Sequence, residues 1–363
     1  MRHSYESYLW PNAVVTYRLH TSIRTGDDED LTAASEAMND ISSKTCITFE
    51  EKKKGDKNFV DLMVDHNKCG HAQMCMVGGR QFAKFGGSCR TMDTMVHELG
   101  HVLCLHHEHE RPDRDHYLEF EGCSEDPVIE PAHKKHPLGI YDYGSQMHYG
   151  CGSCIAGSPK MEGVTKCGDQ ITYGLSIIDA DNLNALYNCQ GCYRHRWRPI
   201  EHLTSEDVKN MYSFGYEDSV GKISPCRGLM NGEITVGKYN WKTKICSLSF
   251  GGKEYQYQYN YGFEVLTIPG GLKQNGATYK LVKRKDVRSS SIIEIPVPAG
   301  REAESGNAQT GFIAYVTVGI AGGGQEDSIG KVWVRDGVLQ KALFVSEGEE
   351  YYVEEKYRVL TCG

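Results

Sequence analysis

The pattern of apolar and polar positions changes near residue 195. Before it, short apolar runs alternate with segments whose apolar residues recur every three to four positions, which predicts strands mixed with helices. After it, helical spacing is lost, and short runs rich in β-branched and aromatic residues are separated by glycine, which predicts strands. We therefore expect an α+β domain over 1–195 and an all-β domain over 196–363.

Within the first domain the pattern predicts strands and helices in alternation. The predicted strands are VVTYRLH at 14–20, CITFEE at 46–51 and NFVDLMV at 58–64. A helix is expected where Leu31, Ala34, Met38 and Ile41 fall on one face, and a last helix at 177–187. The glycine-bounded stretch GGRQFAKFGGSC at 78–89 is expected to form an edge strand.

The segment 94–115, TMVHELGHVLCLHHEHERPDRD, holds the chain's densest set of side chains that bind metals or transfer protons. On a helix, His97 and His101 lie on one face a turn apart, so that both can bind one zinc ion. Glu98 is then placed to act as a general base on a water at the metal. A charged surface helix without a metal is the alternative.

His107 decides between these alternatives. A continuous helix would carry it about 15 Å along the axis from His97, which is too far for a Zn–N bond of about 2.0–2.1 Å. A shared metal therefore requires the chain to turn back soon after His101. Pro112 also limits how far the helix can run.

Composition narrows the class of protein. A net charge of −8 without a basic tract argues against a nucleic-acid partner, and no apolar run is long enough to span a membrane. The 14 cysteines favour disulfides in a secreted protein. The two CxxC pairs, Cys151/Cys154 and Cys189/Cys192, are also compatible with a structural zinc site.

The second half repeats itself. Val236–Tyr239 recurs as Ile329–Val332, each with a central Gly-Lys, and FGGKEYQYQYNYGFEVL at 250–266 recurs as FVSEGEEYYVEEKYRVL at 344–360. The two copies keep nearly the same spacing. We therefore expect two internal repeats, at about 213–266 and 313–360.

The histidine-rich segment resembles the zinc signature of astacin-family metzincin endopeptidases, HExxHxxGxxHExxRxDRD. The matching positions are His97, Glu98, His101, His107, Glu108, Arg111, Asp113, Arg114 and Asp115. A second hallmark of that family, the Met-turn SxMHY, is present at Ser145–Tyr149. The resemblance extends over roughly 5–192 and implies a metzincin catalytic domain, in which a twisted mixed sheet lies beside the active-site helix.

The resemblance also implies roles for single residues. His97, His101 and His107 would bind one catalytic Zn²⁺, with Glu98 as general base and Tyr149 stabilising the oxyanion. Met147 would lie beneath the metal, and Glu108 would contact the mature N-terminus through water. Protein or peptide substrates would pair with the predicted edge strand near Arg80, Gln81 and Phe82.

The cysteines agree with the family pattern only in part. The resemblance implies a bond from Cys46 to Cys189 or Cys192, and another from Cys69 or Cys75 to Cys89. Cys104 stands where the family has glycine, and a positive φ there would cost about 1 kcal/mol. The alternatives for Cys104 are a free buried thiol, a disulfide partner or a competing metal ligand.

The second domain resembles the DM9 repeat over roughly 213–363, a repeat found in natterin-like and mannose-binding lectin proteins. This resemblance implies binding of mannose-type glycans, with Lys238, Glu254 and Lys331 as the polar positions to test. A structural or protein-binding role is the alternative. Together the two halves predict a secreted zinc endopeptidase with an accessory β domain; the alternative is a lectin-like protein that retains a protease fold.

Overall fold

The computed structural model describes residues 6–24, 28–65, 67, 69–87, 89–123, 129, 139–217, 221–258, 262–287, 295–303, 309–319, 325–335 and 338–363. The chain forms two compact units. The first unit comprises Met1–Leu138, Tyr143–Lys160 and Thr165–Cys189; the second comprises Gly139–Asp142, Met161–Val164 and Gln190–Gly363. No helix among the described residues is both long and apolar enough to cross a bilayer.

The first unit is built on a mixed sheet with strand order β2-β1-β3-β5-β4. Its first four members are parallel, and β4 runs antiparallel to β5. The bounds are β1 Val14–Leu19, β2 Thr48–Glu51, β3 Phe59–Val64, β4 Gly70–Ala72 and β5 Arg80–Phe85, with a separate pair, β6 Leu118–Glu119 and β7 Ser158–Pro159. The strands predicted from the apolar runs at 14–20, 46–51 and 58–64 are confirmed.

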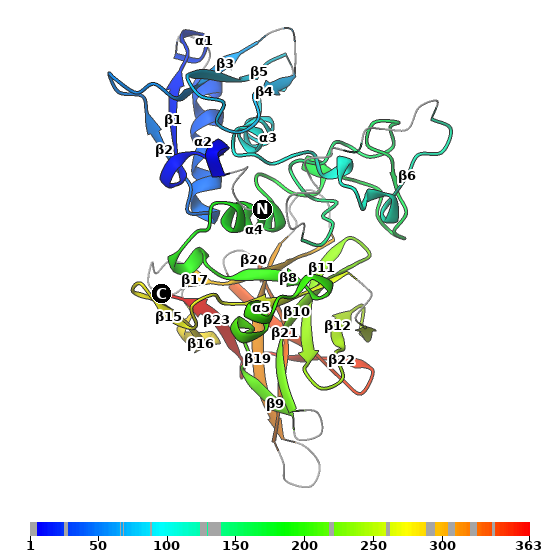
Figure 1. The fold of residues 1–363 in the computed structure, drawn as a ribbon. Helices are drawn as coiled ribbons and strands as arrows, with labels where there is room; N and C mark the ends of the chain where they lie inside the picture. Colours follow the sequence, from blue (N-terminus) through cyan, green and yellow to red (C-terminus); the bar gives the residue numbers. More distant parts are fainter. Residues whose placement is uncertain are drawn as a thin grey trace. The chain divides into compact units, whose positions relative to one another are not determined.

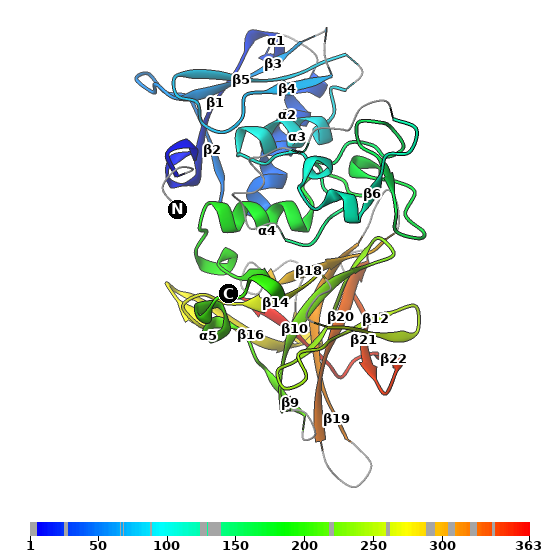
Figure 2. The ribbon, with the colours of Figure 1, turned by 45° about the vertical axis from the view of Figure 1, so that its right-hand side comes forward.

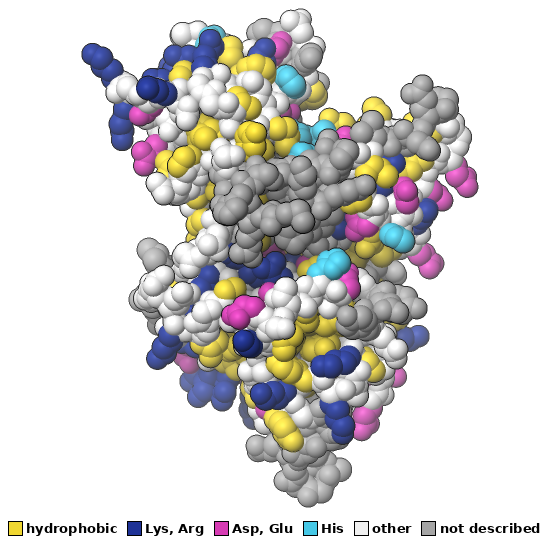
Figure 3. Space-filling model, viewed as in Figure 1, with side chains coloured by type: hydrophobic (Ala, Val, Ile, Leu, Met, Phe, Trp, Pro, Cys, Tyr) yellow, Lys and Arg dark blue, Asp and Glu magenta, His cyan; other side chains and the backbone are white. Residues whose placement is uncertain are grey.

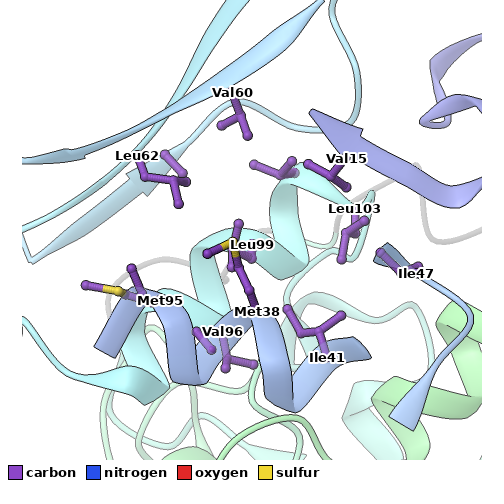
Figure 4. Packing of buried hydrophobic residues seen from close by; sticks show 14 of the residues in the cluster. Val15, Met38, Ile41, Ile47, Val60, Leu62, Met95, Val96, Leu99 and Leu103 are labelled. Carbon is purple, nitrogen blue, oxygen red and sulfur yellow. The ribbon is translucent and has the colours of Figure 1, made fainter. Parts of the chain in front are cut away.

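Helices cover one side of this sheet, as Figures 1 and 2 show for α2 and α3. The bounds are α1 Thr21–Arg24, α2 Asp28–Lys44, α3 Met92–Val102 and α4 Ile177–Leu186. Figure 4 shows Met38 and Ile41 of α2, Val96 and Leu99 of α3 and Val60 of β3 in one apolar core. This packing fixes α3, which carries the first two metal-site histidines, against the sheet.

Two expectations for this unit are wrong. Leu31 is 40% exposed; Asp30 takes the inward position instead, where its carboxylate binds Arg90 at 3.1 Å. The stretch predicted as an edge strand forms β5, which lies inside the sheet between β3 and β4. The short β4 covers its outer side, so the edge of the sheet belongs to Gly70–Ala72.

Sixteen strands form the sheet of the second unit. In chain order they are β8 Arg196–Pro199, β9 Gly215–Glu217, β10 Gly221–Met230, β11 Glu233–Asn240, β12 Cys246–Phe250, β13 Lys253–Tyr257, β14 Phe263–Thr267, β15 Lys273–Gln274, β16 Ala277–Lys283, β17 Ile295–Pro296, β18 Pro298–Arg301, β19 Thr310–Gly319, β20 Gln325–Arg335, β21 Val338–Ser346, β22 Glu349–Val353 and β23 Arg358–Cys362. The predominantly β character predicted for this half is confirmed. One short helix, α5 at Ser205–Asn210, was not predicted, although Thr204 and Asp207 form a capping box at its start.

The strands of the second unit close into a ring. Neighbouring strands pair along the path β19-β20-β21-β22-β13-β12-β11, and β18 pairs with both β11 and β19. Closure leaves the ring without a free edge. Val236, Ile313 and Ile329 are fully buried in one of its apolar clusters.

The two repeats have the same local structure. Gly237 of β11 and Gly330 of β20 each lie against the neighbouring strand's backbone: a Cβ would meet Ser247 O at 1.8 Å and Leu343 O at 1.9 Å, respectively. Only glycine fits such an approach. The glycines of the two Gly-Lys pairs thus meet the same close approach of a paired neighbouring strand. Tyr259–Tyr261 of the tyrosine-rich stretch lie outside the described residues.

All 14 cysteines are paired. The first unit contains Cys46–Cys189, Cys69–Cys89, Cys75–Cys104, Cys123–Cys154 and Cys151–Cys167; the second contains Cys192–Cys362 and Cys226–Cys246. These bonds choose among the alternatives left open by the family pattern. Cys192, which is bonded to Cys362 of the last strand, belongs to the second unit.

Candidate metal centre

The helix α3 presents the first part of the centre. Thr91 caps its N-terminus by accepting a hydrogen bond from the Thr94 amide at 3.2 Å. Its apolar positions, including Val96 and Leu99, are buried in the core. His97 and His101 lie four residues apart on another face of the helix, and Glu98 is buried beside them.

The end of α3 turns the chain back, as the position of His107 requires. The Leu105 amide donates to Gly100 O and the Cys104 amide to His101 O, both at 2.9 Å, which is the hydrogen-bond pattern of a Schellman motif. Cys104 is the left-handed residue of this motif, with φ at 76°. The positive φ that would carry a steric cost at this position is therefore present. Cys104 is neither free nor a ligand, because it forms a disulfide with Cys75.

The steric cost of the left-handed backbone conformation at position 104 can be measured in variants that lack the Cys75–Cys104 disulfide. We expect both Cys75→Ala/Cys104→Ala and Cys75→Ala/Cys104→Gly to be less stable than the wild type by about 2–4 kcal/mol. The glycine variant should be the more stable of the two by about 1 kcal/mol, because glycine adopts positive φ without a steric cost. Chemical denaturation at equal zinc concentration measures both differences. Equal stability of the two double variants would contradict the proposed backbone requirement.

The structure brings the three predicted histidines together. One ring nitrogen from each of His97, His101 and His107 lies within 4.8 Å of the others. His101 Nε2 and His107 Nε2 are 3.1 Å apart. Figure 3 shows a group of histidine side chains reaching the surface of the first unit. The three candidate ligands are each partly exposed. They form the only cluster of three histidines among the potential metal sites of the described residues.

The outer ring nitrogens orient these histidines. His97 Nδ1 donates to Gln146 O at 2.8 Å, and His101 Nδ1 donates to Leu105 O at 2.9 Å. A carbonyl oxygen only accepts, so Nδ1 carries the proton and Nε2 keeps its lone pair for a metal. His107 Nδ1 faces Glu110 Oε1 at 3.3 Å. Such outer partners are characteristic of zinc-bound histidines.

Burial favours the uncharged state of the two histidines on α3. It lowers the pKa of His97 to about 4 and holds the pKa of His101 well below its ordinary value. Neutral imidazole is the form that binds a metal. Three converging imidazole nitrogens, two of them on the fixed helix α3, suit Zn²⁺, which takes three protein ligands at catalytic sites. The residues present therefore fit a catalytic zinc ion.

The Met-turn lies beside the triad and is held by a residue far away in sequence. Asp179 of α4 accepts hydrogen bonds from the Ser145 hydroxyl at 2.7 Å and from the Gln146 amide at 2.8 Å. The carbonyl of Gln146 in turn orients His97. Met147 is buried, and its carbonyl accepts from the Glu108 amide at 3.1 Å, which joins the Met-turn to the segment that carries His107.

Glu98 has the environment expected of a proton-transfer group. Its side chain is buried, and Oε2 has no hydrogen-bond partner among the described residues. Burial raises the pKa of this carboxyl to about 8. A cation bound nearby would favour the charged form. The carboxylate is therefore not committed to an ion pair and is available for a proton.

Tyr149 lies over the triad from the side of the Met-turn. Its ring centroid is 4.6 Å from that of His107 and 5.8 Å from that of His97, and the side chain is 41% exposed. Its amide donates to Nδ1 of His109 at 3.3 Å, and the two rings lie 4.6 Å apart. Burial, followed by the charges of Glu98 and Glu110, raises the pKa of its hydroxyl, so the group is a proton donor.

Other residues predicted for this site have different surroundings. Glu108 accepts from Arg111 Nη1 at 2.8 Å; the predicted contact with the N-terminus involves residues outside the described part of the chain. Arg80 pairs with the buried Asp61, and Gln81 is buried, with its amide nitrogen bonded to Cys75 O at 2.6 Å. Phe82 is partly exposed. These three lie on β5, one strand in from the edge.

The polar residues singled out in the second unit lie in two kinds of environment. Lys331 is 3% exposed, and its ammonium group donates to Glu233, Thr235 Oγ1 at 2.9 Å and Ser249 O at 2.8 Å. An ammonium group has three protons, so these acceptors use all of its donors. Lys238 and Glu254, by contrast, are partly exposed.

Several contributors could not be identified from the sequence. Gln146 and Leu105 accept hydrogen bonds through their main-chain carbonyl oxygens. Every residue type has this group, so the sequence does not reveal such a role. Asp179 and Glu110 are ordinary acidic residues until the fold brings them to the Met-turn and to His107.

Comparison with known proteins gives matches over this half of the chain. The model of the Astacin peptidase family matches residues 2–188. The chain is similar to astacin-like metalloprotease toxin 2 of Loxosceles intermedia, with 29% identity over 51% of this chain and 76% of the toxin. It is also 29% identical to zinc metalloproteinase nas-13 of Caenorhabditis elegans, over 51% of this chain and 42% of the relative. Among solved structures, the hatching enzyme high choriolytic enzyme 1 of Oryzias latipes matches with 26% identity and a TM-score of 0.43, over 52% of this chain and 99% of the enzyme.

Proposed function

Because this chain belongs to the astacin family of peptidases, we propose that its first unit is a zinc endopeptidase that hydrolyses protein substrates. The observation that carries this proposal is the convergence of His97, His101 and His107 beside an uncommitted Glu98. A zinc ion bound by three neutral imidazoles acts as a Lewis acid and lowers the pKa of its water to about 7.

The chain's own residues supply the other steps. Glu98 takes a proton from the attacking water and returns it to the leaving amine, so that both proton transfers use one carboxylate. Tyr149 donates a hydrogen bond to the oxygen that becomes negative as the tetrahedral centre forms. Met147 provides the apolar floor beneath the histidines. Asp179 keeps the Met-turn and hence His97 in place.

The substrate strand is proposed to pair with β4 rather than with β5. An extended peptide adds to the open edge of a sheet through main-chain hydrogen bonds. The sheet of the first unit has two edge strands, β2 and β4, and β4 is the one whose Gly70 lies against Glu98. Arg80, Gln81 and Phe82 would then support β4 from the neighbouring strand β5. Arg80 does so through its pair with Asp61, and Gln81 through its hydrogen bond to Cys75 O.

The test of the proposed activity is cleavage of an unfolded protein such as casein by the purified chain. We expect cleavage that 1,10-phenanthroline abolishes and added zinc restores. Cleavage that is unaffected by the chelator would contradict a metal mechanism.

The paired cysteines indicate an oxidising compartment, so the chain is proposed to act outside the cell.

For the second unit we propose binding of mannose-type glycans around Lys238 and Glu254. Burial acts to raise the pKa of Glu254, but hydrogen bonds from Ser247 and the Gly348 amide, together with the charge of Lys238, keep it below its ordinary value. A fixed carboxylate beside a lysine can accept from and donate to neighbouring sugar hydroxyls.

Replacing Lys238 with Ala is expected to weaken retention on mannose-agarose, while Lys242→Ala, which removes an exposed lysine beyond the same strand, should leave it unchanged. The expected loss is about tenfold in affinity, as for one charge-assisted hydrogen bond. Wild-type protein that passes through mannose-agarose without delay would contradict glycan binding. Retention with no peptidase activity would instead favour a lectin that keeps a protease fold.

A further inference from the structure

In the edge strand β4, the hydrogen-bonding groups of the Gly70 main chain are those that do not face β5. On its inner side the Gly86 amide donates to Cys69 O at 2.9 Å, and the Gln73 amide donates to Phe82 O at 3.2 Å. Hydrogen-bonding groups alternate between the two sides of a strand. The amide and carbonyl groups of Gly70 and Ala72 therefore point away from β5, to the side where no described strand pairs with β4.

The missing side chain of Gly70 leaves the space that Glu98 occupies. A Cβ placed on Gly70 would lie 2.0 Å from Oε1 of Glu98, 2.9 Å from its Cδ and 3.3 Å from its Cγ. Non-bonded carbon and oxygen atoms do not approach within 3.0 Å in this way. Gly70 does not have a positive φ, so glycine is required here by space rather than by backbone angle.

We propose that Gly70 is a positioning residue of the peptidase: its bare backbone sets how closely the substrate-pairing strand approaches the general base. The inference rests on the proposed function, because it assigns Glu98 the proton transfer and β4 the substrate. Any side chain at position 70 must either push the carboxylate aside or lift β4 from α3. Both movements change the distance between the bound peptide and Glu98.

Of these two movements, displacement of the Glu98 carboxylate costs less free energy than lifting β4 from α3. The atoms that a Cβ would meet belong to the end of a flexible side chain, whereas β4 is fixed by its pairing with β5 and by the Cys69–Cys89 bond. The fold and the three histidines should therefore tolerate Gly70→Ala. The reacting geometry should not, since a shift of about 1 Å in a catalytic group costs about 10²-fold in rate.

The kinetic test compares Gly70→Ala with Gly150→Ala. Gly150 has an ordinary φ, and the nearest atom to an added Cβ there is Gln170 Nε2 at 3.7 Å, so this control adds the same methyl group without a clash. We expect kcat on a peptide substrate to fall by about 10²-fold for Gly70→Ala, with zinc content unchanged. KM should change much less. Gly150→Ala should match the wild type in all three quantities.

A double-mutant cycle tests the contact without relying on activity. Gly70→Ala is made in the wild type and in Glu98→Ala, and unfolding is followed by chemical denaturation. Gly70→Ala should lower the denaturation midpoint slightly in the wild type, because the carboxylate must move, and should leave it unchanged in Glu98→Ala, because the methyl group then has room. An equal shift of the denaturation midpoint in both backgrounds would overturn the inference.

The outcomes separate the two proposals. Wild-type protein without chelator-sensitive cleavage would contradict the proposed function, whereas the cycle would still report on the Gly70–Glu98 contact. An active wild type with unchanged kcat in Gly70→Ala would contradict the positioning role alone. Loss of zinc in Gly70→Ala would also overturn it, since the effect would then lie in the metal centre.

Discussion

Replacing Glu98 with Gln is expected to lower kcat for peptide hydrolysis by about 10³-fold, within the range that general acid–base groups supply. Gln has nearly the same shape but cannot accept a proton. Zinc content should not change, because Glu98 is not among the three converging ligands. The measurement is steady-state kinetics on a quenched fluorescent peptide, with metal analysis of the same preparation.

The stability of this variant provides the control. Glu98 is buried and its Oε2 lacks a partner among the described residues, so the fold gains little from the charged carboxylate. An uncharged amide costs less to bury than a carboxylate, and the unfolding midpoint should equal or exceed that of the wild type. Retained activity would contradict the role of Glu98 in proton transfer. Lost activity together with lost zinc would place Glu98 in metal binding instead.

Removing the third ligand should have the largest effect on the metal. Loss of a partner that only orients a ligand lowers metal affinity by about 10–100-fold. Because His107→Ala removes a ligand itself, we expect it to lower zinc affinity by more than this, and peptidase activity to fall in parallel. His107 reaches the other two histidines only because the chain reverses at Cys104. Competition with a chromogenic zinc chelator measures the affinity directly.

A histidine from the same stretch of chain serves as the matched control. His116 lies in the short 3₁₀ helix Arg114–His116, and its side chain is exposed. Replacing it with Ala should leave zinc affinity and activity at wild-type values. If His107→Ala and His116→Ala lowered zinc affinity equally, zinc would be bound by the histidines of this segment in general and not by one defined site.

The metal centre was predictable because its signals are local. The spacing of His97 and His101 is a property of one helix, and the impossibility of reaching His107 along that helix demanded a turn. The turn is present, with a left-handed Cys104. The order of strands at the sheet edge was not predictable, since a three-residue strand such as β4 carries too few positions to show a pattern.

Long-range interactions account for the remaining differences. Asp30 rather than Leu31 faces inward because Arg90, 60 residues away, provides its partner. The lysine of the second Gly-Lys repeat is buried because Glu233 lies opposite it, 98 residues earlier. Neither partner can be read from the neighbouring sequence. The pairing of Cys75 with Cys104 likewise depends on the Cys75 amide bonding His101 O at 2.9 Å, where the loop meets the end of α3.

The central claim is that His97, His101 and His107 bind one zinc ion that the peptidase needs. The most direct measurement is to remove metal from the purified chain and to follow peptide cleavage while zinc is added back, with bound zinc quantified by mass spectrometry. We predict that activity rises in proportion to bound zinc and levels off at one ion per chain. Full activity in the metal-free chain, or no uptake of zinc by the native chain, would contradict the claim.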